Sequence, residues 1–192
     1  MIYERAFDAG ISFAQFVAGA TENRDMWQAM ATRTPLAPEA VEQVRAVSGR
    51  WRLLAIAEDW CGDAVNILPV VARLARESGR LDLRIVGRDA WPRLMDRHLT
   101  NGSRSIPVII LLDDVGTCRG WWGPRPSRLQ AWFEREGRPL GKDARYRELR
   151  RWYARDRGRA IALEIAELVS CGASDGRGDC ANVHSCGDLQ AA

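Results

Sequence analysis

Apolar residues recur along the first quarter of the chain at the three- and four-residue spacing of amphipathic helices. The first group begins at Phe13 and the last ends at Val47. Pro38 favours a helix start, because proline lacks an N–H that would have no partner in the first turn anyway. Residues 11–48 are therefore predicted to form helices, and residues 1–50 an N-terminal helical extension.

Between residues 51 and 87 the pattern changes to that of a strand–helix–strand unit. Residues 51–58 are short and almost continuously apolar, which is typical of a strand buried on both faces. A helical pattern follows Cys61 and runs to Gly79, where glycine can end a helix. Residues 81–87 alternate between apolar and polar positions and are predicted as a second strand. A right-handed crossover is expected to connect the two strands.

Shorter elements complete the central region. Residues 92–99 and 127–136 are predicted as helices, and residues 107–112 as a third strand. A turn then leads into a returning fourth strand over residues 117–122. Residues 51–137 are therefore expected to form one α/β domain with a central mixed sheet and flanking helices.

The last third of the chain is first helical and then polar. Residues 142–169 predict a long, arginine-rich helix that Gly158 divides. Within residues 138–170 we expect this helix to pack on the domain with a solvated arginine face, and the alternative is a phosphate-binding helix. Residues 171–192 are rich in glycine and small polar residues, so a flexible, cysteine-containing tail is expected.

Composition and charge narrow the class of protein. The 192 residues are 46% hydrophobic and 28% charged, as in ordinary globular domains. The net charge is +3 and acids are interspersed among the arginines, so no nucleic-acid partner is predicted. Met1 opens no signal-peptide pattern, and the apolar stretch from Gly10 to Ala20 is too short to span a bilayer. We therefore expect a cytoplasmic protein with no membrane partner, in which the five cysteines do not form a structural disulfide framework.

The segment Trp60-Cys61-Gly62-Asp63 lies between the first predicted strand and the helix that follows. Free backbone N–H groups and the helix dipole at that position favour a thiolate at Cys61. The negative charge of Asp63 opposes this effect, so the direction of the net pKa shift stays open. The expected role of Asp63 is to accept hydrogen bonds from backbone N–H groups of the first turn.

Three features in this order resemble the thioredoxin family. The Trp-Cys-Gly sequence at residues 60–62 is similar to the start of the family's active-site sequence, Trp-Cys-Gly-Pro-Cys. Pro69 corresponds to a helix-kinking proline, and Ile106-Pro107 corresponds to the cis-proline segment that faces the active site. The resemblance implies a thioredoxin-like fold to which the N-terminal helices and the long C-terminal helix are added. It also implies a cis bond and a free sheet edge at Ile106, where a substrate strand can pair.

The sequence departs from the family at the second active-site cysteine, which is replaced by Ala64. The carboxylate that dithiol members carry six residues before the first cysteine is replaced by Ala55. Dithiol proteins attack a disulfide with the first cysteine and release the product with the second. The resemblance therefore implies a monothiol disulfide oxidoreductase of cell redox homeostasis. Cys61 would attack a protein or low-molecular-weight disulfide, and an external thiol such as glutathione, or a tail thiol, would resolve the product without a further cofactor.

Residues around Cys61 are predicted to bind the substrate. The two adjacent tryptophans end the fourth strand, where neighbouring residues point to opposite faces, so one is expected in the core and the other near the surface. Arg125 is expected either to stabilise the thiolate or a substrate carboxylate, or to be a solvated loop residue. The predicted substrate-binding set is Trp60, Gly62, Asp63, Ile106, Pro107, Trp121, Trp122 and Arg125.

The remaining cysteines carry weaker predictions. Cys118 is expected to be a small buried apolar residue. The tail residues Cys171, Cys180, His184 and Cys186 could complete a zinc shell, but they lack a Cys-x-x-Cys pair, so no metal site is predicted. A tail cysteine could instead resolve a mixed disulfide on Cys61.

Two other functions stay open. The first is a non-catalytic thioredoxin-fold binding module in which Cys61 is a remnant. The second is an iron–sulfur carrier similar to monothiol glutaredoxins, of whose Cys-Gly-Phe-Ser motif Gly62 is the match after the cysteine.

Overall fold

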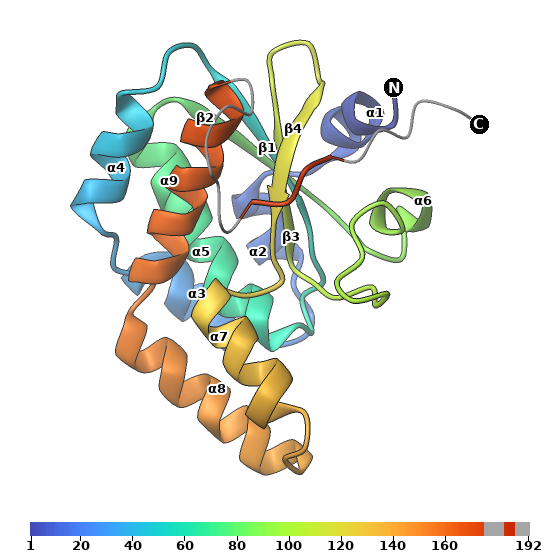
Figure 1. Ribbon diagram of the computed structural model, residues 1–192, viewed down its shortest axis with the longest axis vertical. Helices are drawn as coiled ribbons and strands as arrows, with labels where there is room; N and C mark the ends of the chain where they lie inside the picture. The colour runs from blue at the N-terminus through green and yellow to red at the C-terminus, as the bar shows by residue number, and fades with distance from the viewer. Residues whose placement is uncertain (175–182, 187–192) are drawn as a thin grey trace.

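A four-stranded sheet lies at the centre of the computed structural model, which describes residues 1–174 and 183–186 (Figure 1). The strand order is β2-β1-β3-β4. β1 pairs in parallel with β2, whereas β3 is antiparallel to both β1 and β4. The predicted α/β fold with a central mixed sheet is therefore confirmed. The strands are β1 (Trp51–Ile56), β2 (Leu81–Val86), β3 (Val108–Leu112) and β4 (Cys118–Trp122).

Helices cover both faces of this sheet. On one face α5 packs against β2, and α9 packs against β3 and β4, with α4 against both helices (Figure 1). The opposite face carries α1 and α6 (Figure 1). Every residue of β3 is buried, because this central strand has neighbours on both sides and helices on both faces. These helices are α1 (Ile2–Ala9), α4 (Pro38–Arg45), α5 (Gly62–Ser78), α6 (Pro92–Met95) and α9 (Arg159–Ala173).

The helix α5 matches its predicted limits. Cys61 is its N-cap, and it ends before Gly79, which adopts the left-handed conformation with φ 66° that favours glycine. Pro69 lies inside the helix, as the motif order suggested. Its apolar residues are buried against the sheet, so α5 holds Cys61 at a fixed place at the end of β1.

The N-terminal region contains features that the sequence pattern did not predict. Helix α1 precedes the predicted helical region, which holds α2 (Phe13–Gly19), α3 (Arg24–Arg33) and α4. Between α1 and α2, Ile11 pairs with Ile85 of β2 through two backbone hydrogen bonds of 3.0 and 2.9 Å. This pairing attaches the N-terminal region to the outer edge of β2. The division of the chain at residue 50 stays a prediction.

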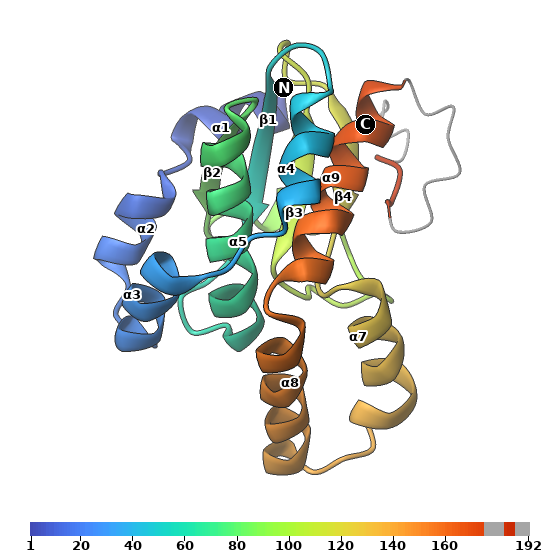
Figure 2. The same ribbon diagram turned by 90° about the vertical axis from the view of Figure 1, so that its left-hand side faces the viewer.

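The long C-terminal helix is divided at Gly158, as expected. A Cβ atom at this glycine would lie 2.7 Å from Val70 Cγ2, and its φ is 80°, so both packing and backbone conformation require glycine. The first half, α8 (Lys142–Asp156), projects below the sheet beside α7 (Ser127–Trp132) and the π-helical turn η1 (Phe133–Gly137) (Figure 2). The second half, α9, packs on the sheet.

The C-terminal residues 183–186 return to β4, which contradicts two predictions about cysteine. Cys186 forms a disulfide with Cys118, and His184 pairs with Trp121 through backbone hydrogen bonds of 3.0 and 2.9 Å. Cys118 is therefore not a free apolar residue, and the expected absence of a structural disulfide was wrong. This pairing has no local sequence pattern, because its partners are 68 residues apart. The rest of the predicted flexible tail, residues 175–182 and 187–192, lies outside the described residues.

Candidate functional site

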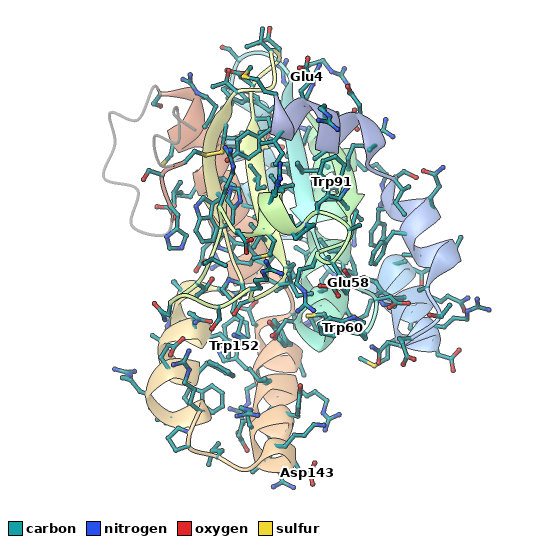
Figure 3. All side chains as sticks on the ribbon, turned by 90° about the vertical axis from the view of Figure 1, so that its right-hand side faces the viewer. Glu4, Glu58, Trp60, Trp91, Asp143 and Trp152 are labelled. Atoms are coloured by element: carbon teal, nitrogen blue, oxygen red, sulfur yellow. A yellow bond between two sulfur atoms is a disulfide. The ribbon has the colours of Figure 1, made fainter. Side chains whose placement is uncertain are left out.

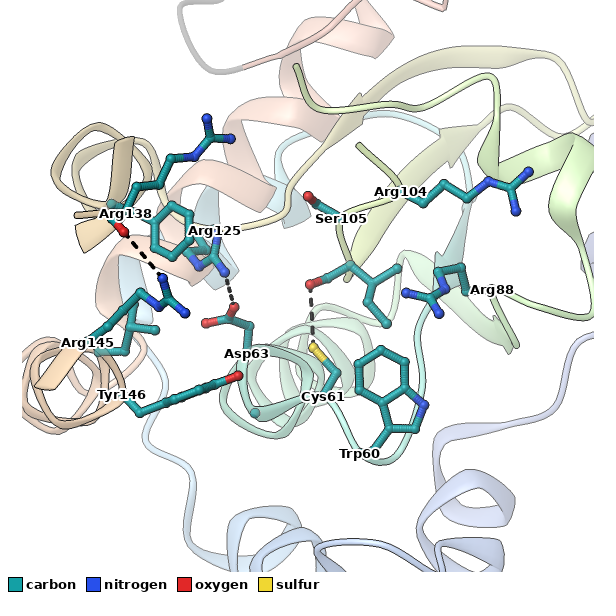
Figure 4. A pocket seen from close by; sticks show the side chains of 14 residues that line it. Trp60, Cys61, Asp63, Arg88, Arg104, Ser105, Arg125, Arg138, Arg145 and Tyr146 are labelled. Atoms are coloured by element: carbon teal, nitrogen blue, oxygen red, sulfur yellow. Dashed lines mark hydrogen bonds and ion pairs between the residues drawn. The ribbon is translucent and has the colours of Figure 1, made fainter. Parts of the chain in front are cut away.

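Cys61 lies on the floor of a cleft of about 460 Å³ at the end of the sheet (Figure 4). Its thiol donates a hydrogen bond of 3.4 Å to the carbonyl oxygen of Ile106, and the Ile106–Pro107 peptide bond is cis. Cys61 is 8% exposed and is among the residues that line this cleft. Among the described residues it is the free cysteine.

The loop before Cys61 is held by the turn between α2 and α3 and by α3 itself. The Asp59 carboxylate accepts hydrogen bonds from the backbone N–H groups of Thr21 (2.8 Å) and Glu22 (3.0 Å). The Asp59 carbonyl oxygen accepts a further bond of 3.0 Å from the indole N–H of Trp27, which is fully buried. Sequence analysis did not find these contacts, because a helix pattern does not indicate which loop its residues touch.

Asp63 is buried beside Cys61 and is bound by two distant side chains. Its carboxylate forms an ion pair of 2.6 Å with Arg125 Nη2 and accepts a hydrogen bond of 2.8 Å from the Tyr153 hydroxyl of α8. Among the described residues its hydrogen-bond partners are these side chains rather than backbone groups of the first turn, so the capping role was wrong. A buried carboxylate requires such partners to offset its lost hydration.

Burial, and after it the negative charge of Asp63, raises the pKa of the Cys61 thiol to about 11. The backbone N–H groups of Ala64 and Asp63 and the charge of Arg125 act in the opposite direction. The direction of the Cys61 pKa shift, which the sequence left open, is therefore upward. In the free protein at neutral pH, Cys61 is a thiol that donates to Ile106.

Arg125 is neither a solvated loop residue nor directed at the thiol. Besides its pair with Asp63, it donates a hydrogen bond of 3.0 Å to Gln130 and stacks 4.0 Å from the Phe133 ring centroid. Its side chain is 13% exposed. Its main contact is therefore the carboxylate that opposes ionisation of Cys61.

The tryptophans of the predicted set divide into two groups. Trp60 is 48% exposed at the end of the sheet near Glu58, and the Arg88 guanidinium lies 4.9 Å from its ring centroid (Figure 3). Trp121 and Trp122 are both buried, and neither is among the described residues that line the cleft. The expected contact patch of one of them with Cys61 is therefore wrong.

Both buried tryptophans have partners elsewhere. The Trp121 ring stacks on His184 with centroids 4.1 Å apart. The Trp122 indole N–H donates to Glu164 of α9 at 2.7 Å. The prediction failed because α9 and residues 183–186 cover both faces of the end of β4.

The cleft brings together residues that the sequence did not single out. Gly62, Asp63, Ile106 and Arg125 line it as predicted neighbours of Cys61, and arginines and aromatic residues from η1 and α8 complete it. Such residues are common on solvated helices, so their pattern gives no signal without the fold. The added lining residues are Arg88, Arg104, Ser105, Phe133, Arg138, Arg145, Tyr146 and Leu149.

Metal binding and membrane insertion gain no support within residues 1–174 and 183–186. No three His, Cys, Asp or Glu side chains converge there in a way that could hold a metal ion. Cys186, one of the zinc ligands considered, is bonded to Cys118, and Cys180 lies outside the described residues. No helix in the described part is both long and apolar enough to cross a membrane.

Comparison with solved structures agrees on the fold. A protein of unknown function from Pseudomonas aeruginosa superposes with a TM-score of 0.70 at 21% identity, over 88% of this chain and 96% of the other. An HIV epitope scaffold superposes with a TM-score of 0.63 at 18% identity, over 90% and 96%. No curated protein matches the chain. A family model described as thioredoxin matches residues 10–145, so the chain belongs to the thioredoxin family.

Proposed function

We propose that this protein is a monothiol disulfide oxidoreductase with Cys61 as its nucleophile. The observation that carries the proposal is the position of the Cys61 thiol, at the N-terminus of α5, on the floor of an open cleft and 3.4 Å from the carbonyl of Ile106. A disulfide that enters this cleft meets the Cys61 sulfur, whose direction is fixed by its hydrogen bond to the Ile106 carbonyl oxygen.

The reaction has two exchange steps. The Cys61 thiolate, after losing its proton to solvent, attacks a disulfide RS–SR, forms Cys61–S–SR and releases RS⁻. An external thiol R′SH, as its thiolate, then attacks the substrate sulfur of this mixed disulfide. It forms RS–SR′ and releases the Cys61 thiolate, so the protein returns to its starting oxidation state. We take the resolving thiol to be external, because Ala64 replaces the local one and the tail cysteines Cys171 and Cys186 are both disulfide-bonded.

The raised pKa of Cys61 sets the balance between these steps. A thiolate of high pKa is a strong nucleophile but a poor leaving group. The first step therefore waits for deprotonation, and the second is slow once the mixed disulfide has formed. We expect the protein to accumulate as a mixed disulfide during turnover.

The cytoplasmic location belongs to this proposal as well, and one observation weighs against it. Structural disulfides persist mainly in oxidising compartments, and Cys118–Cys186 is such a disulfide. A reducing cytoplasm would open it, whereas the chemistry proposed for Cys61 operates in either compartment.

The test is incubation with glutathione disulfide, followed by mass spectrometry of the intact protein. We expect one glutathione adduct on Cys61 in the wild-type protein and none in Cys61→Ser. A Cys118→Ser/Cys186→Ser double variant is the matched control and should keep the adduct. An adduct on the Cys61→Ser protein, or none on the wild-type protein under alkaline conditions, would contradict the proposal.

The alternative is a non-catalytic binding module, and the burial and raised pKa of Cys61 favour it. In that case neither wild-type protein nor Cys61→Ser reacts with any disulfide, even at a pH where the thiol ionises. The same mass-spectrometric experiment therefore separates the two functions.

A further inference from the structure

Five arginine side chains line the cleft that contains Cys61, whereas Asp63 is the one carboxylate among the described residues that line it. The arginines come from five separate segments: the loop after β2, the segment before the cis peptide bond, the β4–α7 loop, the end of η1 and the first half of α8. They are Arg88, Arg104, Arg125, Arg138 and Arg145.

These arginines lie on two opposite sides of Cys61. Figure 4 shows Arg88 and Arg104 on the side of Trp60, and Arg125, Arg138 and Arg145 on the side of Asp63. A molecule whose sulfur reaches Cys61 therefore has guanidinium groups on both sides of that sulfur.

On the Asp63 side, one arginine has no carboxylate partner among the described residues. Arg125 is paired with Asp63, and Arg138 with Glu134 at 2.9 Å. Arg145 has no ion pair within the described part of the chain, and its Nη1 donates a long hydrogen bond of 3.5 Å to the Arg138 carbonyl oxygen. It is half-buried, which strengthens its attraction for an anion relative to a fully solvated arginine.

On the opposite side, Arg88 is the arginine best placed to exchange its partner. It pairs with its sequence neighbour Asp89, whose side chain is 66% exposed. Such a surface ion pair contributes little, so a ligand carboxylate can replace it. Arg104 is held more closely, because its bonds to the two oxygens of Asp96 are 2.7 and 2.8 Å, whereas those of Arg88 to the two oxygens of Asp89 are 2.8 and 3.3 Å.

The size of the cleft limits the ligand. At about 460 Å³ it falls within the range of small-molecule sites, roughly 300 to 1,000 Å³. We propose that the disulfide reacting at Cys61 is a small, peptide-like molecule with a carboxylate on each side of its sulfur, one bound by Arg145 and the other by Arg88. This inference rests on the function proposed above and names the substrate class of that site.

The test compares three small disulfides that differ in charge: anionic glutathione disulfide, neutral bis(2-hydroxyethyl) disulfide and cationic cystamine. The readout is the rate of mixed-disulfide formation on Cys61, expressed as the ratio of the anionic to the neutral rate. We expect this ratio to fall about fivefold in Arg145→Gln and in Arg88→Gln, and about tenfold or more in the double variant. Added salt should lower the wild-type ratio, because it screens the guanidinium charges.

The matched controls are Arg147→Gln, two residues after Arg145 on α8, and Arg93→Gln on α6, both exposed and outside the cleft. Their ratios should equal that of the wild-type protein. Equal rates for all three disulfides, or ratios unchanged in the Arg145 and Arg88 variants, would overturn the inference and leave the proposed function intact. No reaction with any of the three would overturn the proposed function.

A binding measurement further separates failure of this inference from failure of the proposed function, because it does not depend on disulfide exchange. S-methylglutathione is added to the Cys61→Ser protein, in which no exchange can occur, and the heat of binding is measured. Binding that is about fivefold weaker in the Cys61→Ser/Arg145→Gln double variant than in Cys61→Ser supports the inference. Absence of binding, or binding unaffected by that change, overturns it whatever Cys61 does.

Discussion

At the scale of single residues, the Asp63 carboxylate is, after burial, the main cause of the raised pKa of Cys61. Two side chains from distant parts of the chain, Arg125 and Tyr153, hold it beside the thiol. Cys61 and its place at a helix start could be predicted from the sequence. The direction of its pKa shift could not, because it depends on burial and on partners that only the folded chain brings together.

The first residue-scale prediction concerns pH. Because the pKa of Cys61 is raised to about 11, its thiolate fraction rises about tenfold per pH unit below that value. The rate of Cys61 alkylation by iodoacetamide, followed by mass spectrometry, should therefore keep rising from about pH 7 to about pH 10. A plateau near the pKa of about 8.5 of an ordinary thiol would disprove the effect of burial.

The second concerns Asp63→Asn. Removal of the charge lowers the pKa of Cys61 and leaves the Arg125 charge nearby, so alkylation at about pH 8 should be roughly tenfold faster. The unpaired Arg125 should also lower the free energy of unfolding by about 3 kcal/mol, measured in urea. Tyr153→Phe is the control, since it removes one hydrogen bond and keeps the charge, and its alkylation rate should stay closer to that of the wild-type protein.

At the scale of elements, α3 and the turn that joins it to α2 support the loop between β1 and α5. The sequence predicted the helices between residues 11 and 48, the strand–helix–strand unit and the break at Gly158, because each has a local pattern. It did not predict α1 or the Ile11–Ile85 pairing, because a single paired residue has no periodicity. Contacts between segments far apart in the chain, such as those of Asp59, leave no local signal.

Asp59→Ala tests this support. Loss of its bonds to Thr21 and Glu22 should reduce the free energy of unfolding by about 1–2 kcal/mol. It should also speed alkylation of Cys61 at constant pH, because the loop that buries the thiol becomes more mobile. Asp8→Ala, at an exposed position on α1, is the matched control. An unchanged alkylation rate in Asp59→Ala would show that the loop does not depend on this anchor.

At the scale of the whole molecule, the C-terminal residues are attached to the sheet at two points. The Cys118–Cys186 disulfide and the Trp121–His184 pairing hold residues 183–186 against β4. Neither could be predicted, since the cysteines showed no spacing typical of a known framework and the fold alone brings the tail back. The sequence therefore indicated Cys61 as the proposed nucleophile, whereas only the fold shows the cleft and the disulfide of Cys118.

Reduction of this disulfide should release the segment. We expect the free energy of unfolding to fall by about 2–4 kcal/mol, because the cross-link no longer restricts the unfolded chain. Hydrogen exchange at the Trp121 amide, which donates to His184, should become faster in the reduced protein and in Cys186→Ser. Unchanged exchange in both samples would mean that the pairing holds without the disulfide.

The position of β4 at the end of the strand order gives this attachment a wider consequence. An unpaired edge strand exposes backbone N–H and C=O groups that can pair with another chain, which makes it a site of aggregation. Here His184 pairs with β4 at one edge of the sheet, and Ile11 pairs with β2 at the other edge. The oxidised protein should accordingly remain dispersed at concentrations where its reduced counterpart begins to precipitate.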